Sequence, residues 1–455
     1  MRAFWTTSLA LLAFLAGCQT PGELRLQLAT AEPDPLADAA SLRLRFFDGS
    51  DDRMVEIPFG GEAELSDGLR GEVVVDLQIE AQSSRGVTLA RGRLIGDVTP
   101  PAGEVADETV ALLRAGEFSR IDGLTLDGVG PEPCAVPLAD GRLLIAGGGS
   151  SDGWILDPDR GLLAPAATGL GLGPGPCQSA TLTDGRVALV GGGDTTLQVI
   201  HGDGYTAHES IDTGRDGGAL AALQGGQLAW WMGGSTDDAD LTSDLLIAGQ
   251  DGVAEGPRVE GLTLTDHRVA CSADGSACAA LGGPGDAPSW WRVGAADVAD
   301  AEGGYALEPL VHDGDQPDLP GRGAVAFDDH LVLGLLEKDD VWLGLYDVRD
   351  DGELVWSRGQ PAGLASSALA SAGNGRAFLV GGDDGQGSSG ALWSLDAVDG
   401  SYLLSPVDSA VLAYPRQAAA AVALADGRVV VVGGIDAGQA VAAIEIYEPF
   451  DSPAP

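Results

Sequence analysis

The stretch Ala425-Asp426-Gly427-Arg428-Val429-Val430-Val431-Val432-Gly433-Gly434 decides the fold of this chain. Its Asp-Gly step favours a tight turn, because glycine readily adopts the positive φ that such turns need. The four valines that follow make a short β-branched apolar run, which is typical of a buried strand. The Gly-Gly pair then interrupts the strand. The stretch therefore predicts a turn, a buried strand and a break, in that order.

The same pattern recurs upstream, almost unchanged, in residues 140–148 and 184–192. Looser copies end at the Gly-Gly pairs that begin at Gly233, Gly282 and Gly381. Residues 324–334 form a further copy that lacks the second glycine, which brings the count to seven. The copies lie roughly 40 to 50 residues apart, and a period of that size is typical of repeat architectures.

Each copy is expected to contain four strands. One apolar strand precedes the Asp-Gly turn and a second ends at Gly-Gly. The third carries aromatic or aliphatic residues, as at Trp154 and Trp393, and the fourth follows, as at Tyr205 and Tyr402. Four strands with a Gly-Gly stop resemble the kelch motif of galactose-oxidase-like proteins, whose repeats are propeller blades. The resemblance covers residues 116–455 and implies an all-β fold with a seven-bladed kelch-like β-propeller.

The last copy has only three predicted strands, the third at 444–447, before the chain stops. A spare apolar strand, residues 118–126, precedes the first complete copy. Kelch propellers commonly close by pairing strands from the two ends of the repeat region. The resemblance therefore implies that 118–126 is the outer strand of the final blade, which leaves no long unpaired edge.

Residues 19–115 are expected to form a separate domain. Apolar residues alternate with polar ones through Leu42, Leu44 and Phe46 and again through Leu77 and Ile79. A period of two with one apolar face predicts strands, and several such runs predict a small β-sandwich. The paired cysteines and core tryptophan of immunoglobulin domains are absent, so the likeness to them is one of architecture only. The domain is interpreted as a spacer.

The N-terminus, residues 1–18, has the pattern of an export signal. Arg2 gives a positive start, residues 9–15 are apolar, and Leu15-Ala16-Gly17-Cys18 resembles the lipobox of bacterial lipoproteins. The resemblance implies lipid attachment at Cys18, while a plain cleaved signal is the alternative. Gln19 follows the cysteine where enterobacterial relatives retained in the inner membrane have Asp, which implies an outer-membrane location, on the periplasmic or cell-surface side.

A net charge of −43 argues against nucleic acid as a partner, because phosphate binding needs clustered Lys and Arg. The acidity is interpreted as a solvated surface that keeps the protein monomeric, with binding of cations or a basic partner as the alternative.

Four cysteines remain besides Cys18, and an even number in an exported protein favours disulfides. Cys271 and Cys278 flank an Asp-Gly turn, so they are expected to face each other across a hairpin. Cys134 and Cys177 occupy nearly matching positions in successive repeats, so they are expected to join neighbouring blades. Free buried thiols are the alternative.

Loops after the second strands are acidic and are expected to emerge on one face of the propeller. This possible binding face comprises Asp152, Asp194, Asp237, Asp238, Asp240, Asp286, Asp339, Asp340, Asp383, Asp384 and Asp436. Their oxygens would suit calcium, but no EF-hand pattern is present. No other cofactor or metal is expected.

Catalytic motifs receive little support. Residues 149–153 match Gly-x-Ser-x-Gly, but they follow a Gly-Gly stop instead of leading into a helix. The histidines and tyrosines do not match the copper site of galactose oxidase. The sequence therefore predicts a non-catalytic propeller that binds a protein or glycan of the cell envelope. The alternatives are an enzyme of the kelch-like oxidase or sugar epimerase type and a purely structural envelope protein.

Overall fold

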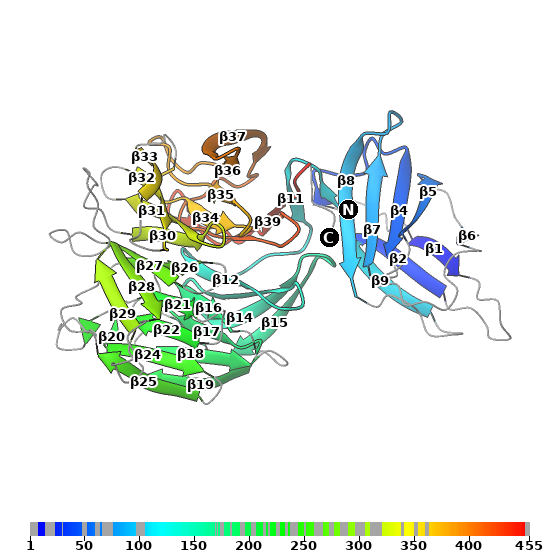
Figure 1. Ribbon diagram of the computed structural model, residues 1–455. Coiled ribbons are helices and arrows are strands. Elements are labelled where there is room, and N and C mark those ends of the chain that lie inside the picture. Colours follow the sequence, from blue (N-terminus) through cyan, green and yellow to red (C-terminus); the bar gives the residue numbers. More distant parts are fainter. Residues whose placement is uncertain are drawn as a thin grey trace. The chain divides into compact units, whose positions relative to one another are not determined.

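The computed structural model describes residues 8–13, 23–29, 31–47, 52–59, 64–65, 76–96, 105–168, 170, 172, 177–182, 184–191, 196–201, 206–212, 215–216, 219–223, 228–232, 235–236, 244–249, 252–258, 267–272, 277–282, 290–295, 305–309, 321–337, 341–349, 354–359 and 364–450. Every regular element in these residues is a β-strand (Figure 1). Within these ranges, no helix of a length and apolarity suited to crossing a membrane is found.

The chain divides into two compact units. The first comprises Met1–Thr125, Leu156–Leu163 and Ile444–Pro455, and the second comprises Leu126–Ile155 and Ala164–Ala443. Residues from both ends of the sequence therefore belong to the first unit.

The first unit contains two larger sheets. One has the order β6 (Glu64–Leu65), β1 (Ser8–Ala13), β2 (Glu23–Ala29) and β9 (Val105–Ala111). The other has the order β10 (Leu113–Arg114), β8 (Thr88–Ile95), β7 (Asp76–Gln82), β4 (Ser41–Phe47) and β5 (Asp52–Pro58). In the first of these sheets β2 and β9 run parallel, whereas the second is antiparallel between all of its neighbouring strands.

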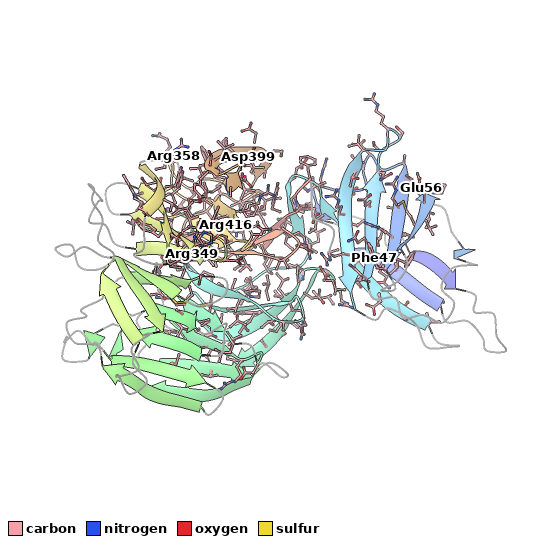
Figure 2. All side chains as sticks on the ribbon, viewed as in Figure 1. Phe47, Glu56, Arg349, Arg358, Asp399 and Arg416 are labelled. Carbon is pink, nitrogen blue, oxygen red and sulfur yellow. A yellow bond between two sulfur atoms is a disulfide. The ribbon has the colours of Figure 1, made fainter. Side chains whose placement is uncertain are left out.

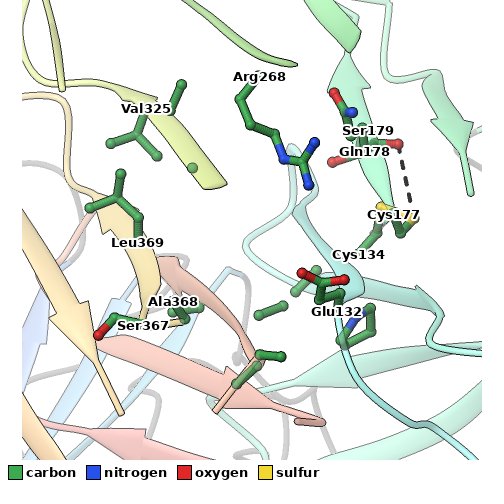
Figure 3. A pocket seen from close by; sticks show the side chains of 18 of the residues that line it. Glu132, Cys134, Cys177, Gln178, Ser179, Arg268, Val325, Ser367, Ala368 and Leu369 are labelled. Carbon is green, nitrogen blue, oxygen red and sulfur yellow. Dashed lines mark hydrogen bonds between the residues drawn. A yellow bond between two sulfur atoms is a disulfide. The ribbon is translucent and has the colours of Figure 1, made fainter. Parts of the chain in front are cut away.

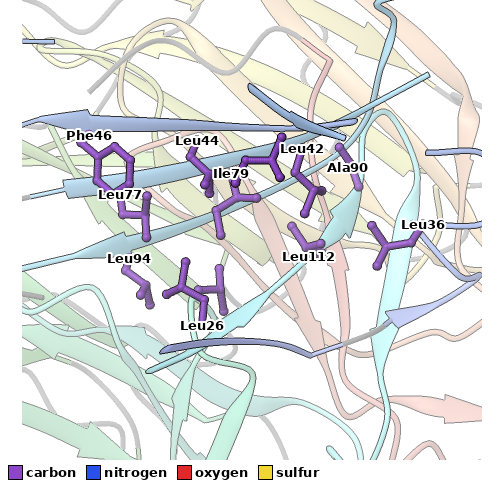
Figure 4. Packing of buried hydrophobic residues seen from close by; sticks show 13 residues of the cluster. Leu26, Leu36, Leu42, Leu44, Phe46, Leu77, Ile79, Ala90, Leu94 and Leu112 are labelled. Atoms are coloured by element: carbon purple, nitrogen blue, oxygen red, sulfur yellow. The ribbon is translucent and has the colours of Figure 1, made fainter. Parts of the chain in front are cut away.

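One apolar core joins side chains of both sheets (Figure 4). Leu44 and Phe46 of β4 and Leu77 of β7 contribute from one sheet, and Leu26 of β2 from the other. The alternation predicted from the sequence is confirmed, because β4 alternates between fully and partly buried residues along its length. Each strand therefore buries one face, as a period of two requires.

Asp76 departs from the simple alternation. It precedes Leu77 in β7 and, by alternation, belongs to the face opposite the apolar one, yet it is only 8% exposed. Burial raises the pKa of its carboxyl group, the nearby Arg93 guanidinium opposes this rise, and Asp159 adds to it. A carboxylate on the outer face of this sheet is therefore poorly solvated, which alternation alone does not reveal.

A third sheet region of the first unit contains strands from distant parts of the sequence, in the order β3 (Ala31–Glu32), β11 (Phe118–Ile121) and β42 (Glu445–Tyr447). Strand β11 pairs antiparallel with β42, with Phe118 opposite Tyr447. Their rings lie 5.7 Å apart between centroids. The predicted pairing of the spare strand with the C-terminal strand is confirmed, although β11 ends at Ile121, before residue 126.

The C-terminal residues after β42 are also held by this unit. The Gly116 N–H donates to the Glu448 carbonyl at 2.6 Å. Arg91 Nη1 donates to the carbonyls of Pro449 at 3.0 Å and Phe450 at 2.6 Å. Gly116 has a positive φ of 77°, and a Cβ there would collide with the Phe450 ring. A side chain at this position would therefore strain the backbone and require the Phe450 ring to move.

The second unit is built from four-stranded antiparallel sheets in which strand order follows chain order. The first two sheets are β12 (Pro133–Pro137), β13 (Leu143–Gly147), β14 (Ser150–Asp157), β15 (Leu162–Thr168), and β16 (Gln178–Thr181), β17 (Val187–Val190), β18 (Thr196–His201), β19 (Thr206–Asp212). The next two are β21 (Ala219–Leu223), β22 (Leu228–Met232), β24 (Asp244–Gly249), β25 (Gly252–Arg258), and β26 (His267–Cys271), β27 (Ala277–Gly282), β28 (Trp290–Ala295), β29 (Tyr305–Pro309). Two more are β30 (Gly321–Ala326), β31 (Leu331–Glu337), β32 (Val341–Asp347), β33 (Leu354–Gly359), and β34 (Ala368–Ser371), β35 (Arg376–Val380), β36 (Ala391–Val398), β37 (Ser401–Val411).

The last repeat contributes the hairpin β38 (Ala420–Ala423) and β39 (Val429–Val432) to this unit. Two short ribbons complete the described strands, namely β20 (Arg215–Asp216) with β23 (Ser235–Thr236), and β40 (Ile435–Asp436) with β41 (Gln439–Ala440). The sheet boundaries agree with the repeat pattern predicted from the sequence.

The first strands of the repeats form a closed cycle of neighbours. In chain order β12, β16, β21, β26, β30, β34 and β38 each lie against the next, and β38 returns to β12. Successive sheets also share apolar cores, as where Leu144 of β13 and Leu189 of β17 belong to one cluster. Radially arranged four-stranded sheets around a ring of first strands are the architecture of a β-propeller.

The Asp-Gly-Arg turn has the same geometry in the three repeats whose sequence contains all three residues. Gly141, Gly185 and Gly427 have φ of 83°, 84° and 87°. In each copy one aspartate oxygen accepts the N–H of the arginine two residues later, at 3.1 Å. The other oxygen accepts that arginine's Nε at 2.8 Å. The arginine thus closes the turn that the sequence predicted from Asp-Gly alone.

The Gly-Gly pair is required where neighbouring chain segments approach closely. Gly433 has φ of 62°, and a Cβ there would lie 2.8 Å from Pro133. The fully buried Arg416 donates from Nη1 to the carbonyls of Gly433 at 3.2 Å and Ala443 at 2.8 Å (Figure 2). The pair therefore ends the strand and also makes room for its neighbours.

Candidate functional site

The seven first strands surround a central channel. At one end of this channel, called the mouth, backbone hydrogen bonds join neighbouring repeats. Glu132, Ser366 and Ala418 stand at equivalent positions before their first strands, with φ of 52°, 53° and 54°. The Ala418 N–H donates to the Ser366 carbonyl at 3.0 Å, and the Glu132 N–H donates to the Ala418 carbonyl at 2.6 Å. The Glu132 carbonyl accepts the Cys177 N–H at 3.0 Å. Left-handed backbone at non-glycine residues is unusual and is often found at functional sites.

Glu337 takes part in the same set of contacts through its side chain. One of its carboxylate oxygens accepts the Ser366 N–H at 2.6 Å, and the other accepts the Ser366 hydroxyl at 3.3 Å. The Ser367 hydroxyl donates to the Gly381 carbonyl at 3.1 Å. These two serine hydroxyls therefore hold the mouth in shape.

A cavity of about 280 Å³ opens at this mouth (Figure 3). Its polar side chains include Glu132, Gln178, Ser179 and Arg268, while residues 418–421 contribute a run of alanines. Gln178 Oε1 accepts the Leu220 N–H at 3.0 Å, which fixes the orientation of the side-chain amide. The cavity is therefore walled by first strands, with small residues leaving the space.

A second cavity of about 680 Å³ lies farther along the first strands. Ser179, Leu220, Val269 and Val325 line both cavities. Apart from its serines and Thr181, the second cavity has mostly apolar walls, among them Pro137. The channel thus changes along its length from a polar mouth to an apolar interior.

Both predicted disulfides are confirmed. Cys134 is bonded to Cys177 and Cys271 to Cys278. Cys271 and Cys278 lie directly opposite each other in the β26–β27 ladder, as predicted for a hairpin. The bond between Cys134 and Cys177 lies in the wall of the mouth and joins neighbouring repeats.

The predicted acidic face is only partly covered by the described residues. Asp152 and Asp436 are exposed, whereas Asp383 and Asp384 each accept a backbone N–H from two residues later, at 2.8 Å. None of these four lines the mouth cavity. The others, Asp194, Asp237, Asp238, Asp240, Asp286, Asp339 and Asp340, lie outside the described residues, as does Cys18.

No group of three or more His, Cys, Asp or Glu in the described ranges is placed to hold a metal ion. A calcium ion bound by the acidic loops remains a prediction. The Gly-x-Ser-x-Gly match at residues 149–153 lies at the start of β14, so it leads into a strand and lacks the helix of a nucleophile elbow.

Glu132 and Arg268 belong to none of the motifs from which site residues are predicted in the sequence. The sequence does contain a signal for Glu132. Aligning the repeats by their Gly-Gly pairs places it at the same position as Ser366 and Ala418, and Glu132 is the charged residue of these three. Arg268 carries no comparable signal. Its role in the wall depends on which strands face the channel.

No protein-family model matches this sequence, and neither does any curated protein. Solved structures with some likeness include a streptogramin B lyase, at a TM-score of 0.48 and 12% identity, covering 71% of this chain and 95% of that one. Another is a fungal alcohol oxidase of the AA5 family in complex with copper, at 0.41 and 16%, covering 71% and 66%. Likenesses this distant say nothing of function, and the β-propeller follows from the sheet topology itself.

Proposed function

We propose that this chain is a lipid-anchored lipoprotein of the cell envelope, placed at the outer membrane. Its propeller binds a protein or glycan partner without catalysing a reaction. In this proposal the two larger sheets of the first unit are a β-sandwich spacer, and the second unit with the terminal strands is a seven-bladed kelch-like propeller.

The observation that carries the proposal is the pair of disulfides in a chain that begins with a lipobox-like sequence. Disulfides persist in exported proteins and are rare in reducing compartments. Residues 15–18 supply the anchor in this reading, and Gln19 supports the outer membrane as the destination.

Signal cleavage would remove strand β1, which pairs with β2 and β6. Strand β2 would keep its parallel ladder with β9, which runs from Glu23 to Ala29 without a break. Leu26 would keep its place in the apolar core. We therefore assign β1 to the precursor and expect the mature domain to fold without it.

Seven blades are supported by the repeat count and by the closed cycle of first strands. A binding role is supported by the channel mouth, where φ-positive residues and a disulfide hold the rim in shape. Preformed concave sites of this kind are typical of ligand-binding surfaces. Exposed acidic residues such as Asp152 and Asp436 supply polar contacts for a partner.

The anchor is tested by Cys18→Ser in the full chain expressed in a bacterial host. The variant should lose its lipid and leave the membrane fraction, because the acyl chains provide the attachment. Thr20→Ala is the matched control and should remain in membranes. A Cys18→Ser protein that still sediments with membranes after a salt wash would refute the anchor.

The binding role is tested with the soluble Cys18→Ser protein as bait in cross-linked envelope extract and on a glycan array. We expect one protein or glycan class to be enriched over a bait whose Asp383 and Asp384 are both replaced by Asn. Equal recovery with both baits would contradict a role for the acidic loops in binding.

A further inference from the structure

Asp76, the first residue of β7, has a buried carboxyl group that its surroundings satisfy only in part. The residue is 8% exposed, and its Oδ1 atom has no hydrogen-bond partner in the described part of the chain. Its other oxygen lies 4.0 Å from Arg93 Nη2, which is too far for a hydrogen bond. A buried carboxylate needs hydrogen bonds and opposite charges to replace its hydration. Here that replacement is incomplete.

The charged groups around Asp76 come from two neighbouring strands and from one turn. Arg93 of β8 and Arg45 of β4 both stand opposite Gln78, so they lie on the same face of the sheet as Asp76, two residues along β7. Asp159 lies in the turn between β14 and β15. Burial is the largest influence and raises the pKa of Asp76, Arg93 and Arg45 oppose the rise, and the negative charge of Asp159 adds to it.

The turn that carries Asp159 belongs to the first unit, in which residues 156–163 are included. Two contacts fix it to β9. The Ala111 N–H donates to the Asp159 carbonyl at 2.7 Å, and Arg160 Nε donates to the Glu108 carboxylate at 3.2 Å. Arg160 also pairs with Asp157 of the turn itself, at 3.2 Å. The backbone of the turn is therefore held in place by groups other than Asp76.

These contacts keep two carboxylates near each other, because the turn cannot move Asp159 away from Asp76 without breaking them. When both groups are ionised, like charges oppose the docked position of the turn. A proton on Asp76 removes one of the two charges and turns an acceptor without a partner into a possible donor. The contacts of Ala111 and Arg160 persist in either case. The turn is therefore held at every pH, but less firmly when Asp76 is ionised.

We propose that Asp76 is a proton-sensitive contact that holds the β14–β15 turn in the first unit more firmly in acid than at neutral pH. The proton comes from solvent and no covalent step is involved. This conformational device goes beyond the envelope role proposed above and does not depend on it. Its sign follows from linkage, because a group whose pKa is raised by folding adds stability that is lost as the pH rises through the folded value.

The first test compares Asp76→Asn with the native full chain in urea titrations. Asparagine keeps the shape of the side chain and removes its charge. The variant should unfold at a higher urea concentration than the native protein at a pH of about 7, and this advantage should shrink as the pH is lowered to about 4, where the native carboxyl group becomes protonated. Asp122→Asn is the matched control, since Asp122 is an exposed aspartate of the same unit, and it should behave as the native protein does. A less stable Asp76→Asn at neutral pH, or an advantage that persists unchanged in acid, would overturn the proposal.

The second test measures the turn directly and also works on the native protein. Hydrogen exchange, corrected for the intrinsic rate at each pH, reports how often the bond from the Ala111 N–H to Asp159 opens. Protection of this amide should rise a few-fold in the native protein as the pH falls from about 7 to about 5, and should stay constant in Asp76→Asn. The Phe59 N–H, which donates to the Ala40 carbonyl at 2.9 Å, is the control and should not change. Unchanged protection of Ala111 in the native protein, or the same rise in the variant, would overturn the role of Asp76.

Discussion

The first and last copies of the repeat contain the same Asp-Gly-Arg turn in very different surroundings. In both, the aspartate accepts the arginine N–H at 3.1 Å and its Nε at 2.8 Å. The Arg428 and Asp426 side chains are only 6% and 9% exposed, whereas Arg142 and Asp140 are 39% and 46% exposed. Identical local geometry therefore occurs once inside the protein and once at its surface.

The difference matters because the free energy of an ion pair depends more on its solvation than on its distances. An exposed pair exchanges good hydration for a modest attraction and contributes little. A buried pair contributes little in net terms as well, but losing one partner leaves an unsolvated charge behind. The second copy, Asp184 and Arg186, lies between these cases, at 31% and 7% exposed.

Breaking the buried ion pair between Asp426 and Arg428 should have the largest effect on the free energy of unfolding. Arg428→Met keeps most of the aliphatic stem and leaves the Asp426 carboxylate buried without its guanidinium. We expect a loss of about 3 kcal/mol in the free energy of unfolding, measured by urea titration. Arg428→Lys should recover only part of this, because an ammonium group lacks the planar fork. A loss no larger than that of the exposed copy would contradict the role given to burial.

Arg186→Met should have an intermediate effect of about 1 kcal/mol. The arginine is buried, but the Asp184 carboxylate is exposed enough to be hydrated once its partner is gone. The same urea titration measures it, with Arg428→Met as the upper reference. If the two variants are equally destabilised, the exposure of the carboxylate does not set the cost.

Arg142→Met should change the free energy of unfolding by no more than about 0.5 kcal/mol. Both side chains are well solvated, so each regains water when the pair is broken. The small effect should diminish further at high salt, since exposed charges are screened. Salt-independent destabilisation in a thermal melt would point to lost packing of the arginine stem instead.

The smallest expected effect is the pH dependence of the stability contributed by the exposed pair of Asp140 and Arg142. Partial burial alone would raise the pKa of Asp140, but hydrogen bonds from the Arg142 side chain and N–H outweigh it, so the pKa lies below its ordinary value. A lowered folded-state pKa gives stability that is present above the unfolded value of about 3.9 and lost as the pH falls through the folded value. The stability difference between the native protein and Arg142→Met should therefore narrow as the pH is lowered from about 6 to about 3. A difference that widens in acid would contradict this sign.

Local pattern was enough to predict most of the strands and the chemistry of the turns. Val429 to Val432 are all fully buried, as an uninterrupted β-branched run before Gly-Gly suggested. Both disulfides followed from the position of each cysteine relative to its turn. These predictions succeeded because turn, strand and register are set by residues close in the sequence. The burial of Asp76 could not be predicted in this way, because alternation does not report what covers the outer face of a sheet.

The candidate site could not be found in the same way. Glu132 and Arg268 are 136 residues apart in number and belong to different repeats, so no local spacing connects them. They share a cavity only because every first strand faces the common channel.

The sequence by itself determined the repeat, the four-stranded unit, the Asp-Gly-Arg and Gly-Gly turns and the cysteine pairs. Each of these depends on backbone conformations and contacts within one or two neighbouring repeats. Tertiary structure alone decided which copy of a motif is buried, how β11 meets β42, and which side chains line the mouth. Those properties arise when the chain returns on itself, because solvation and cavity walls belong to surfaces brought together from distant residues.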